Sequence, residues 1–216
     1  MEAIIFLFLT GIIALFLGIF KQPKLTTVSS ILGIVAAGLV QYLPLNILSD
    51  KYNILEFGDA GNAFVILALI ITALIILTGD KGFQEDKSHV GDYHALLLFS
   101  LSGGIILIGF KDIFMFFLGL EILSIPLYVL AGAKRQSKES SEAAVKYFFM
   151  GAFATCLLLF GVALVYGSTQ SFELEKIWET AKNPVGPMFY VGLLFILASF
   201  LFKVGAAPFH FWVPDV

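Results

Sequence analysis

The stretch DIFMFFLGLEILSIPLYVLAGA, residues 112–133, decides the fold, because it is long and apolar enough to cross a bilayer as one helix. Glu121 lies near its midpoint. A carboxylate is unfavourable inside a membrane, so an intramembrane Glu predicts a functional site. Pro126 follows five residues later and cannot donate a backbone hydrogen bond to the carbonyl of Ile122. The pattern predicts a helix break one turn from the acid.

A similar arrangement recurs near the end of the chain, where Lys203 precedes Pro208 by five residues in FLFKVGAAPFHFW. Pro208 is therefore a second predicted helix break. Once the loop residues are set aside, three ionisable groups remain inside predicted helices: Glu121, Lys146 and Lys203. Each also has a structural interpretation. Glu121 would bond a neighbouring helix, while Lys146 and Lys203 would extend their ammonium groups to the membrane surface.

The composition is that of an integral membrane protein. Hydrophobic residues make up 59% of the 216 residues and charged residues only 13%, with a mean hydropathy of +0.94. A soluble domain carries about 25% charged residues. The single cysteine, Cys156, excludes an intrachain disulfide and a cysteine-based zinc or iron–sulfur site. No basic run predicts a nucleic-acid partner, and no motif predicts a bound cofactor or metal.

Seven apolar runs are close to the length that a spanning helix needs. They are continuous rather than alternating, which favours an all-α polytopic bundle over a β-barrel. The first run lacks the basic start and cleavage site of a secretory signal, so we expect a retained transmembrane helix. The segment SFELEKIWETAK predicts a short amphipathic helix between the last two runs. The runs lie at about 3–20, 27–43, 62–78, 93–110, 113–132, 143–167 and 187–207.

Lysine and arginine residues in the loops predict the orientation, because they are more frequent on the cytoplasmic side. With the N-terminus outside, seven such residues lie inside and four outside, which favours a periplasmic N-terminus. The inside residues are Lys21, Lys24, Lys81, Lys87, Lys134, Arg135 and Lys138, and the outside residues are Lys51, Lys111, Lys176 and Lys182.

His94, at the start of the fourth run, is predicted to lie at the membrane interface.

A buried carboxylate and ammonium suit proton transfer. Desolvation favours the neutral form of each group, whereas a nearby opposite charge favours the charged form. An opposite charge at about 4 Å contributes roughly 4 kcal/mol at an effective dielectric constant near 20. Because the two effects are similar in size, a Glu–Lys pair that opens and closes would switch between charged and neutral forms near neutral pH.

Three segments together resemble the antiporter-like membrane subunits of respiratory complex I: MFFLGLEILSIPLYVLAG (115–132), SSEAAVKYFFMGAFATCLLLFGVALVYG (140–167) and FLFKVGAAPFHFWVPDV (200–216). They are most similar to the subunit N, or subunit 2, family of proton-pumping NADH–quinone oxidoreductase. The resemblance implies the N-terminal half of a roughly fourteen-helix fold. Residues 1–92 would form an N-terminal three-helix segment, and residues 93–216 an incomplete first antiporter-like repeat. We therefore expect the chain to be part of a longer subunit.

The resemblance also implies roles for individual residues. Glu121 would pair with Lys146, and Lys203 would be the central proton carrier. The helix that carries Lys203 would be broken at Pro208. His210 is a candidate member of the proton path. Trp212, Pro214 and Asp215 are expected to be structural.

The function implied by the resemblance is that of a proton-translocating membrane-arm subunit of NADH–quinone oxidoreductase, a translocase of the bacterial inner membrane. The partners would be the other membrane-arm subunits and the lipid bilayer. NADH or another donor, FMN, iron–sulfur clusters and quinone would bind elsewhere in the complex. Two alternatives stay open. One is a subunit of a multisubunit sodium/proton antiporter or membrane-bound hydrogenase, and the other is a purely structural helix bundle.

Overall fold

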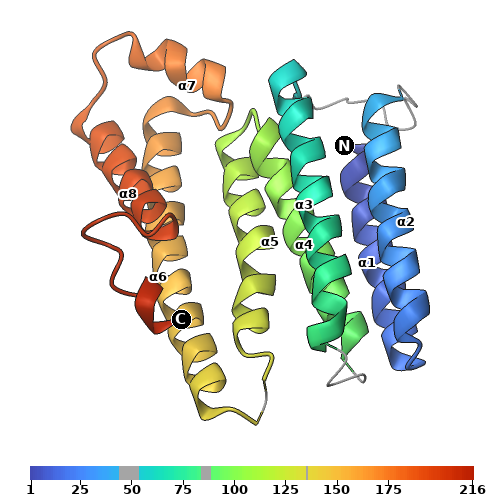
Figure 1. Ribbon diagram of the computed structural model, residues 1–216. Coiled ribbons are helices and arrows are strands. Elements are labelled where there is room, and N and C mark those ends of the chain that lie inside the picture. The colour runs from blue at the N-terminus through green and yellow to red at the C-terminus, as the bar shows by residue number, and fades with distance from the viewer. Residues whose placement is uncertain (44–53, 84–88, 135) are drawn as a thin grey trace. The chain divides into compact units, whose positions relative to one another are not determined.

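The computed structural model describes residues 1–43, 54–83, 89–134 and 136–216, and for residues 80–83 it describes the backbone only. Every regular element over these residues is helical (Figure 1), which confirms the predicted all-α class. The elements are α1 (Glu2–Ile19), α2 (Pro23–Tyr42), α3 (Asp59–Phe83), α4 (Val90–Gly109), α5 (Ile113–Ala131), α6 (Lys138–Thr169), α7 (Leu174–Ala181), α8 (Pro187–Lys203) and the 3₁₀ helix η2 (Val213–Asp215).

Within the described residues, six helices, α1 to α6, are long and apolar enough to cross a membrane. Helix α8 is also apolar but has only 17 residues. These seven helices coincide with the seven predicted apolar runs. Helix α7 lies in the predicted amphipathic segment, with Ile177 buried and the neighbouring Trp178 exposed. The polytopic helical class is therefore confirmed.

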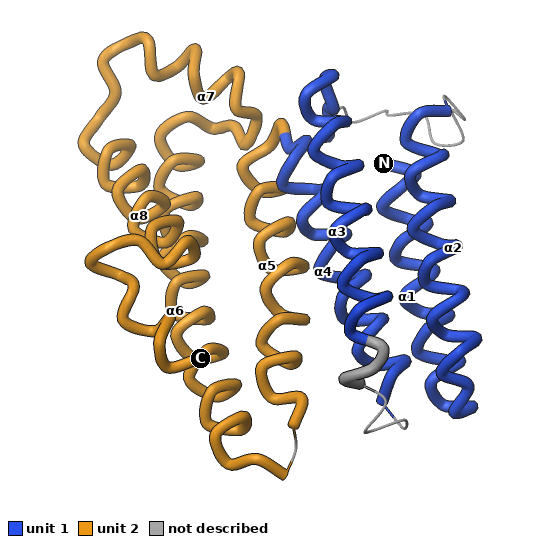
Figure 2. Tube along the Cα trace, in the orientation of Figure 1, with its two compact units in different colours: residues 1–110 blue, residues 111–216 orange. Residues whose placement is uncertain are grey.

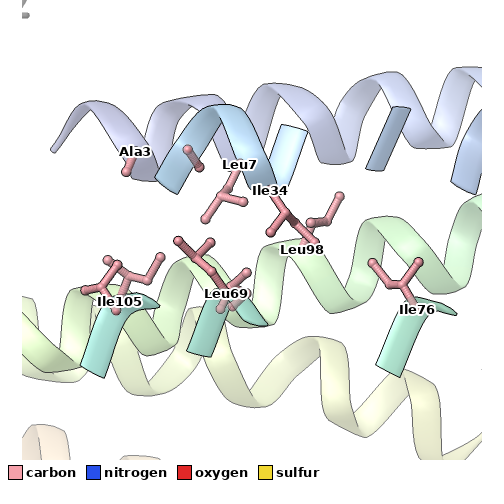
Figure 3. Close-up of a cluster of buried hydrophobic side chains, with 10 residues drawn as sticks. Ala3, Leu7, Ile34, Leu69, Ile76, Leu98 and Ile105 are labelled. Carbon is pink, nitrogen blue, oxygen red and sulfur yellow. The ribbon is translucent and has the colours of Figure 1, made fainter. Parts of the chain in front are cut away.

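The chain forms two compact units, residues 1–110 and 111–216 (Figure 2). Helix α4 packs with α1, α2 and α3 in the first unit. The predicted division at residue 92 concerns the repeat of the family rather than packing, and it stays a prediction. The buried cluster of the first unit draws on all four helices (Figure 3) and contains Ala3, Leu7, Ile34, Ala37, Val65, Leu69, Ile76, Leu98, Leu101 and Ile105.

The His94 side chain is fully buried in the first unit, and its predicted position at the membrane interface stays a prediction. Its Nδ1 atom lies 3.2 Å from the hydroxyl oxygen of Ser30 on α2. The start of α4 is covered by α1, since Gly18 and Gly91 bring the two backbones together. A Cβ atom added to Gly91 would lie 2.5 Å from the Cα atom of Gly18. Such glycine contacts permit close helix packing. The place of His94 near the start of a predicted helix does not reveal that another helix covers it.

The orientation of the chain stays a prediction. Of the loop residues that carry it, Lys51, Lys87 and Arg135 lie outside the described residues, and Lys81 is described by its backbone only.

In the second unit, α6 packs against both α5 and α8. The backbones of α6 and α8 meet at two glycines. A Cβ atom on Gly161 would lie 2.7 Å from the carbonyl oxygen of Gly192, and one on Gly192 would lie 2.9 Å from that of Gly161. Further along, the buried Ser199 hydroxyl donates to the carbonyl of Ala154 at 2.7 Å. Close backbone approach and an interhelical hydrogen bond together hold α8 on α6.

The predicted helix break at Pro126 is not found, whereas Pro208 lies in the non-helical segment that follows α8. Helix α5 continues through the buried Pro126, because a proline removes one backbone hydrogen bond without ending a packed membrane helix. Helix α8 ends at Lys203, five residues before Pro208. Gly205 ends it, with a φ of 65°.

The end of α8 is a Schellman motif. The backbone nitrogen of Gly205 donates to the carbonyl of Phe202 at 3.0 Å, and that of Ala206 donates to the carbonyl of Leu201 at 2.9 Å. The indole nitrogen of Trp212 also donates to the Phe202 carbonyl at 3.0 Å. The segment after the helix therefore returns to cover its last turn, which places Lys203 at a fixed helix end.

The glycine contact predicts the effect of a single methyl group. We expect Gly192→Ala to lower the free energy of unfolding by about 1–3 kcal/mol, because the added Cβ overpacks the α6–α8 contact. Thermal unfolding of the detergent-solubilised protein, followed by the helical circular dichroism signal, measures this loss. Gly186→Ala is the matched control, since a Cβ atom there meets nothing within 4 Å. Equal melting temperatures for the two variants would contradict the close contact.

Candidate functional site: a buried glutamate–lysine pair

Glu121 and Lys203, which are 82 residues apart in sequence, meet in the second unit. The Nζ atom of Lys203, at the end of α8, lies 3.4 Å from Oε1 of Glu121 on α5. Their side chains are only 10% and 20% exposed, respectively. The two ionisable residues singled out near the prolines therefore form one buried ion pair.

The Lys203 ammonium has three oxygen partners, all on α5. Its Nζ atom donates to the hydroxyl of Tyr128 at 2.9 Å, to that of Ser124 at 3.2 Å and to the Glu121 carboxylate at 3.4 Å. Positions 121, 124 and 128 follow the i, i+3, i+7 spacing of one helix face. An ammonium group has three N–H donors, and each of them is matched by an acceptor.

Helix α6 adds a hydroxyl to the other side of the pair. The Thr155 hydroxyl lies 2.5 Å from the same Oε1 atom of Glu121 and 3.1 Å from the carbonyl oxygen of Gly151. The site is thus built from three helices: α5 supplies the acid, α8 the base and α6 a polar partner for the acid.

Aromatic rings pack beside the pair. The ring of Tyr128 meets that of Tyr147 edge-on, with centroids 4.6 Å apart. Tyr147 stacks on Trp212 at 5.0 Å, and Trp212 stacks on Phe202 at 5.7 Å. Rings from α5, α6, α8 and the final segment therefore form one continuous series that begins at Tyr128, the partner of the ammonium. The ammonium side chain is only 10% exposed, and low exposure strengthens its interaction with the carboxylate.

Lys146 does not pair with Glu121 in this structure, contrary to the expected pairing. It lies nine residues before Thr155 on α6, which is about 13 Å along the helix axis. Its Nζ atom lies 2.8 Å from Oε1 of Glu142 and 3.7 Å from Oδ2 of Asp215, and its side chain is 40% exposed. Lys203 is the partner of the acid instead. A role for Lys146 in proton transfer stays a prediction.

The remaining predicted residues lie in the segment after α8. The side chain of His210 is exposed, seven residues beyond Lys203, and its role in a proton path stays a prediction. Trp212 and Asp215 contact Tyr147 and Lys146 of α6, respectively. These contacts agree with the structural role expected for the two residues.

Sequence reasoning missed three hydroxyl groups. Ser124 and Tyr128 had a signal, because both fall on the face of a helix that carries Glu121. Thr155 had none, since nothing in the sequence says which turn of α6 faces the acid. Within the described residues, no group of three or more His, Cys, Asp or Glu side chains gathers that could hold a metal ion. The polar groups of the site are suited to binding and moving protons.

The pair has two electrically balanced states. In one, a protonated Lys203 faces an ionised Glu121. In the other, the proton has moved from Nζ to the carboxylate, which leaves a neutral amine and a carboxylic acid. Both states carry zero net charge. The difference in desolvation cost between the two states is therefore smaller than the cost of ionising either group alone at the same buried position.

The fold and the pair define a polytopic helical membrane protein with an internal ionisable site. The family model described as "NADH:quinone oxidoreductase/Mrp antiporter, TM" matches residues 110–216, about half of the chain. These residues contain the whole site. The chain belongs to this family of membrane subunits.

The curated relatives agree with the family match. The chain is 38% identical over its full length to NADH-quinone oxidoreductase subunit N of Flavobacterium psychrophilum and covers 48% of that protein. It is also 38% identical over its full length to the subunit N of Cytophaga hutchinsonii and covers 47% of it. The chain therefore spans about half the length of the curated relatives it matches.

Solved structures show the same architecture. A chain of respiratory complex I from Thermus thermophilus with bound aureothin is 28% identical, with a TM-score of 0.75, over 99% of this chain and 46% of that one. A chain of the membrane-bound sulfane sulfur reductase, an archaeal respiratory membrane complex, has a TM-score of 0.82 over 100% of this chain and 47% of its own. At 24% identity, the second match shows a shared fold alone.

The buried pair predicts a measurable coupling between its members. We expect Glu121→Gln and Lys203→Met together to destabilise the protein less than the sum of the single changes, with a coupling energy of at least about 1 kcal/mol. Each single change leaves the other partner buried and uncompensated. Unfolding free energies of the four proteins in this double-mutant cycle measure the coupling.

The chain supplies a matched control pair. Lys176 and Glu173 on the protein surface lie 2.8 Å apart, with side chains 60% and 57% exposed. Their cycle is expected to give only about 0.3–0.5 kcal/mol. A coupling for Glu121 and Lys203 no larger than this control would show that the pair is not held as described.

Proposed function

We propose that this chain carries the ionisable site of a proton-translocating membrane-arm subunit of NADH–quinone oxidoreductase. The observation that carries the proposal is the hydrogen-bonded Lys203–Glu121 pair, buried in apolar helices. An intramembrane charge marks an ion pathway more often than a structural contact. The subunit N relatives, and the complex I chain of similar fold, support the choice of assembly.

In this proposal, Lys203 is the proton carrier and Glu121 is its charge partner. While the pair is closed, the carboxylate stabilises the protonated ammonium. When the pair opens, the ammonium loses an opposite charge in a medium of low dielectric constant, which favours release of its proton. Lys146 would change this balance from the far end of α6, and His210 would receive or deliver protons beyond α8.

The redox chemistry of the proposed assembly lies on other subunits. NADH or another donor would be oxidised there through FMN and iron–sulfur clusters, and a quinone would be reduced. The partners of this chain would be the other membrane-arm subunits and the lipids of a bacterial inner membrane, with the N-terminus on the periplasmic side. Opening and closing of the Lys203–Glu121 pair would be driven through those neighbours.

A multisubunit sodium/proton antiporter is the second candidate. The description of the matching family, which includes Mrp antiporters, favours this possibility. The two differ in their energy source. A redox pump acidifies vesicles when an electron donor is added, whereas an antiporter does so when a sodium gradient is imposed.

Replacing the carrier tests the proposal directly. We expect Lys203→Met, in the full-length subunit of the intact assembly, to lower donor-driven proton pumping by at least tenfold and to slow quinone reduction, because a methionine cannot bind a proton. Pumping into sealed inverted membrane vesicles is measured with a pH-sensitive dye while quinone reduction is followed in parallel. Lys182→Met, an exposed lysine beyond α7, is the matched control and is expected to behave as wild type.

Each outcome distinguishes one interpretation. Normal pumping by a correctly assembled Lys203→Met variant would refute the carrier role and favour a structural bundle. Wild-type vesicles that respond only to a sodium gradient, with no iron–sulfur protein in the purified assembly, would favour the antiporter.

A further inference from the structure

We infer that Tyr128 and Thr155 are positioning residues, whose hydroxyl groups hold Lys203 and Glu121 in place in both protonation states. The inference rests on the proposed function and deepens it. Its starting point is that each member of the pair contacts both the opposite charge and a hydroxyl group. An ionised carboxylate only accepts hydrogen bonds and an ammonium only donates them, whereas a hydroxyl does both.

Tyr128 can serve either form of Lys203. When Nζ is protonated, it donates to the tyrosine oxygen across the observed 2.9 Å. When Nζ has lost a proton, its lone pair can accept from the tyrosine O–H across the same distance. Ser124 is less suited to this exchange, because its hydroxyl would first have to give up the hydrogen bond that it donates to the carbonyl of Leu120 at 2.6 Å. Tyr128 is therefore the partner that keeps the neutral amine hydrogen-bonded.

Thr155 does the same for Glu121. When the carboxylate is ionised, the threonine hydroxyl donates to Oε1 at 2.5 Å. When Glu121 is protonated, its O–H can donate to the threonine oxygen, and the threonine O–H can turn to the carbonyl of Gly151 at 3.1 Å. The alternative acceptor is already in place, so the exchange needs only a rotation of the hydroxyl group.

The Tyr128 hydroxyl packs against a glycine of α6. Its oxygen lies against Gly151 so closely that an added Cβ atom there would overlap it. Tyr128 is only 5% exposed, and its ring is held edge-on by Tyr147. The contacts with Gly151 and Tyr147 fix the Tyr128 hydroxyl beside the ammonium. A side chain larger than that of glycine at position 151 would occupy the place of this hydroxyl.

These contacts matter because the pair is buried. A buried polar group that loses its hydrogen bond is destabilised, and the side chain then moves to find another partner. A lysine that left its place on each deprotonation would have to return before it could be reprotonated. The described titratable groups that face Lys203 are Glu121 and Tyr128 on α5, with Tyr147 of α6 behind Tyr128.

The test removes one hydroxyl at a time from the full-length subunit in the intact assembly. Tyr128→Phe and Thr155→Val keep the shape of each side chain and lose only the exchangeable hydrogen bond. We expect each to lower donor-driven quinone reduction and pumping by roughly tenfold and to displace the pH–activity profile by about one pH unit. The KM for quinone should be unchanged, because the quinone site lies elsewhere.

Matched controls separate positioning from packing. Tyr190→Phe removes an exposed hydroxyl from α8, and Thr169→Val removes one on α6 that bonds backbone carbonyls. Both are expected to keep the wild-type rate and profile. Thr155→Ser retains a hydroxyl at the acid and should restore most of the activity lost in Thr155→Val.

Gly151→Ala approaches the same contact from α6, because the new methyl group displaces the Tyr128 hydroxyl while leaving both hydroxyls present. It should reproduce the displaced pH profile. Gly167→Ala on the same helix is its control, since a Cβ atom there meets first the flexible end of Met188, at 3.0 Å. This arm keeps the test decisive if Tyr128→Phe fails to assemble.

The outcomes are distinguishable from those of the proposed function. Displaced profiles for Tyr128→Phe, Thr155→Val and Gly151→Ala, with rescue by Thr155→Ser, would support the positioning role. Wild-type profiles for these variants, in an assembly where Lys203→Met abolishes pumping, would overturn it and leave the proposed function standing. Lower rates with an unmoved profile and no rescue would also overturn it, as simple packing defects. A wild-type assembly that does not pump would refute the proposed function itself.

Discussion

The three hydrogen bonds of the Lys203 ammonium to one face of α5 are the constraint on which the second unit depends. A buried ammonium is tolerated only where its donors are matched and an opposite charge is near. Meeting this requirement brings the end of α8 to the middle of α5, and α6 must pack against both. The small residues along α6, Gly151 and Gly161, allow these approaches, one to the Tyr128 hydroxyl and the other to α8.

The end of α8 shows how a local signal supports this geometry. Gly205 stops the helix immediately after Lys203 through a Schellman motif, and Trp212 returns to bond the last turn and stack on Tyr147 of α6. The lysine therefore sits at a boundary between helix and irregular backbone. Trp212, Tyr147 and Tyr128 form one continuous series of ring contacts, which connects the segment after α8 with the hydrogen-bond partner of the ammonium.

Much of this could be predicted from the sequence, for physical reasons that particular residues illustrate. The seven apolar runs follow from bilayer thickness, and a Glu and a Lys surrounded by apolar residues indicated the site from desolvation alone. The partner of Glu121 could not be predicted in the same way, because pairing depends on the depth and rotation of each helix. Lys146 and Lys203 are chemically equal candidates in the sequence, and only packing places Thr155, rather than Lys146, opposite the acid.

The prolines illustrate a related limit. Pro126 and Pro208 share an offset of five residues from a buried charge, yet one lies inside a continuous helix and the other beyond a helix that a glycine has already ended. A missing backbone donor is a permissive signal, whereas a residue at positive φ that satisfies two terminal carbonyls is a determining one. The more informative neighbours of the two charges were therefore the hydroxyl residues Ser124 and Tyr128 and the helix-ending Gly205. Each of these acts by completing hydrogen bonds that burial makes obligatory.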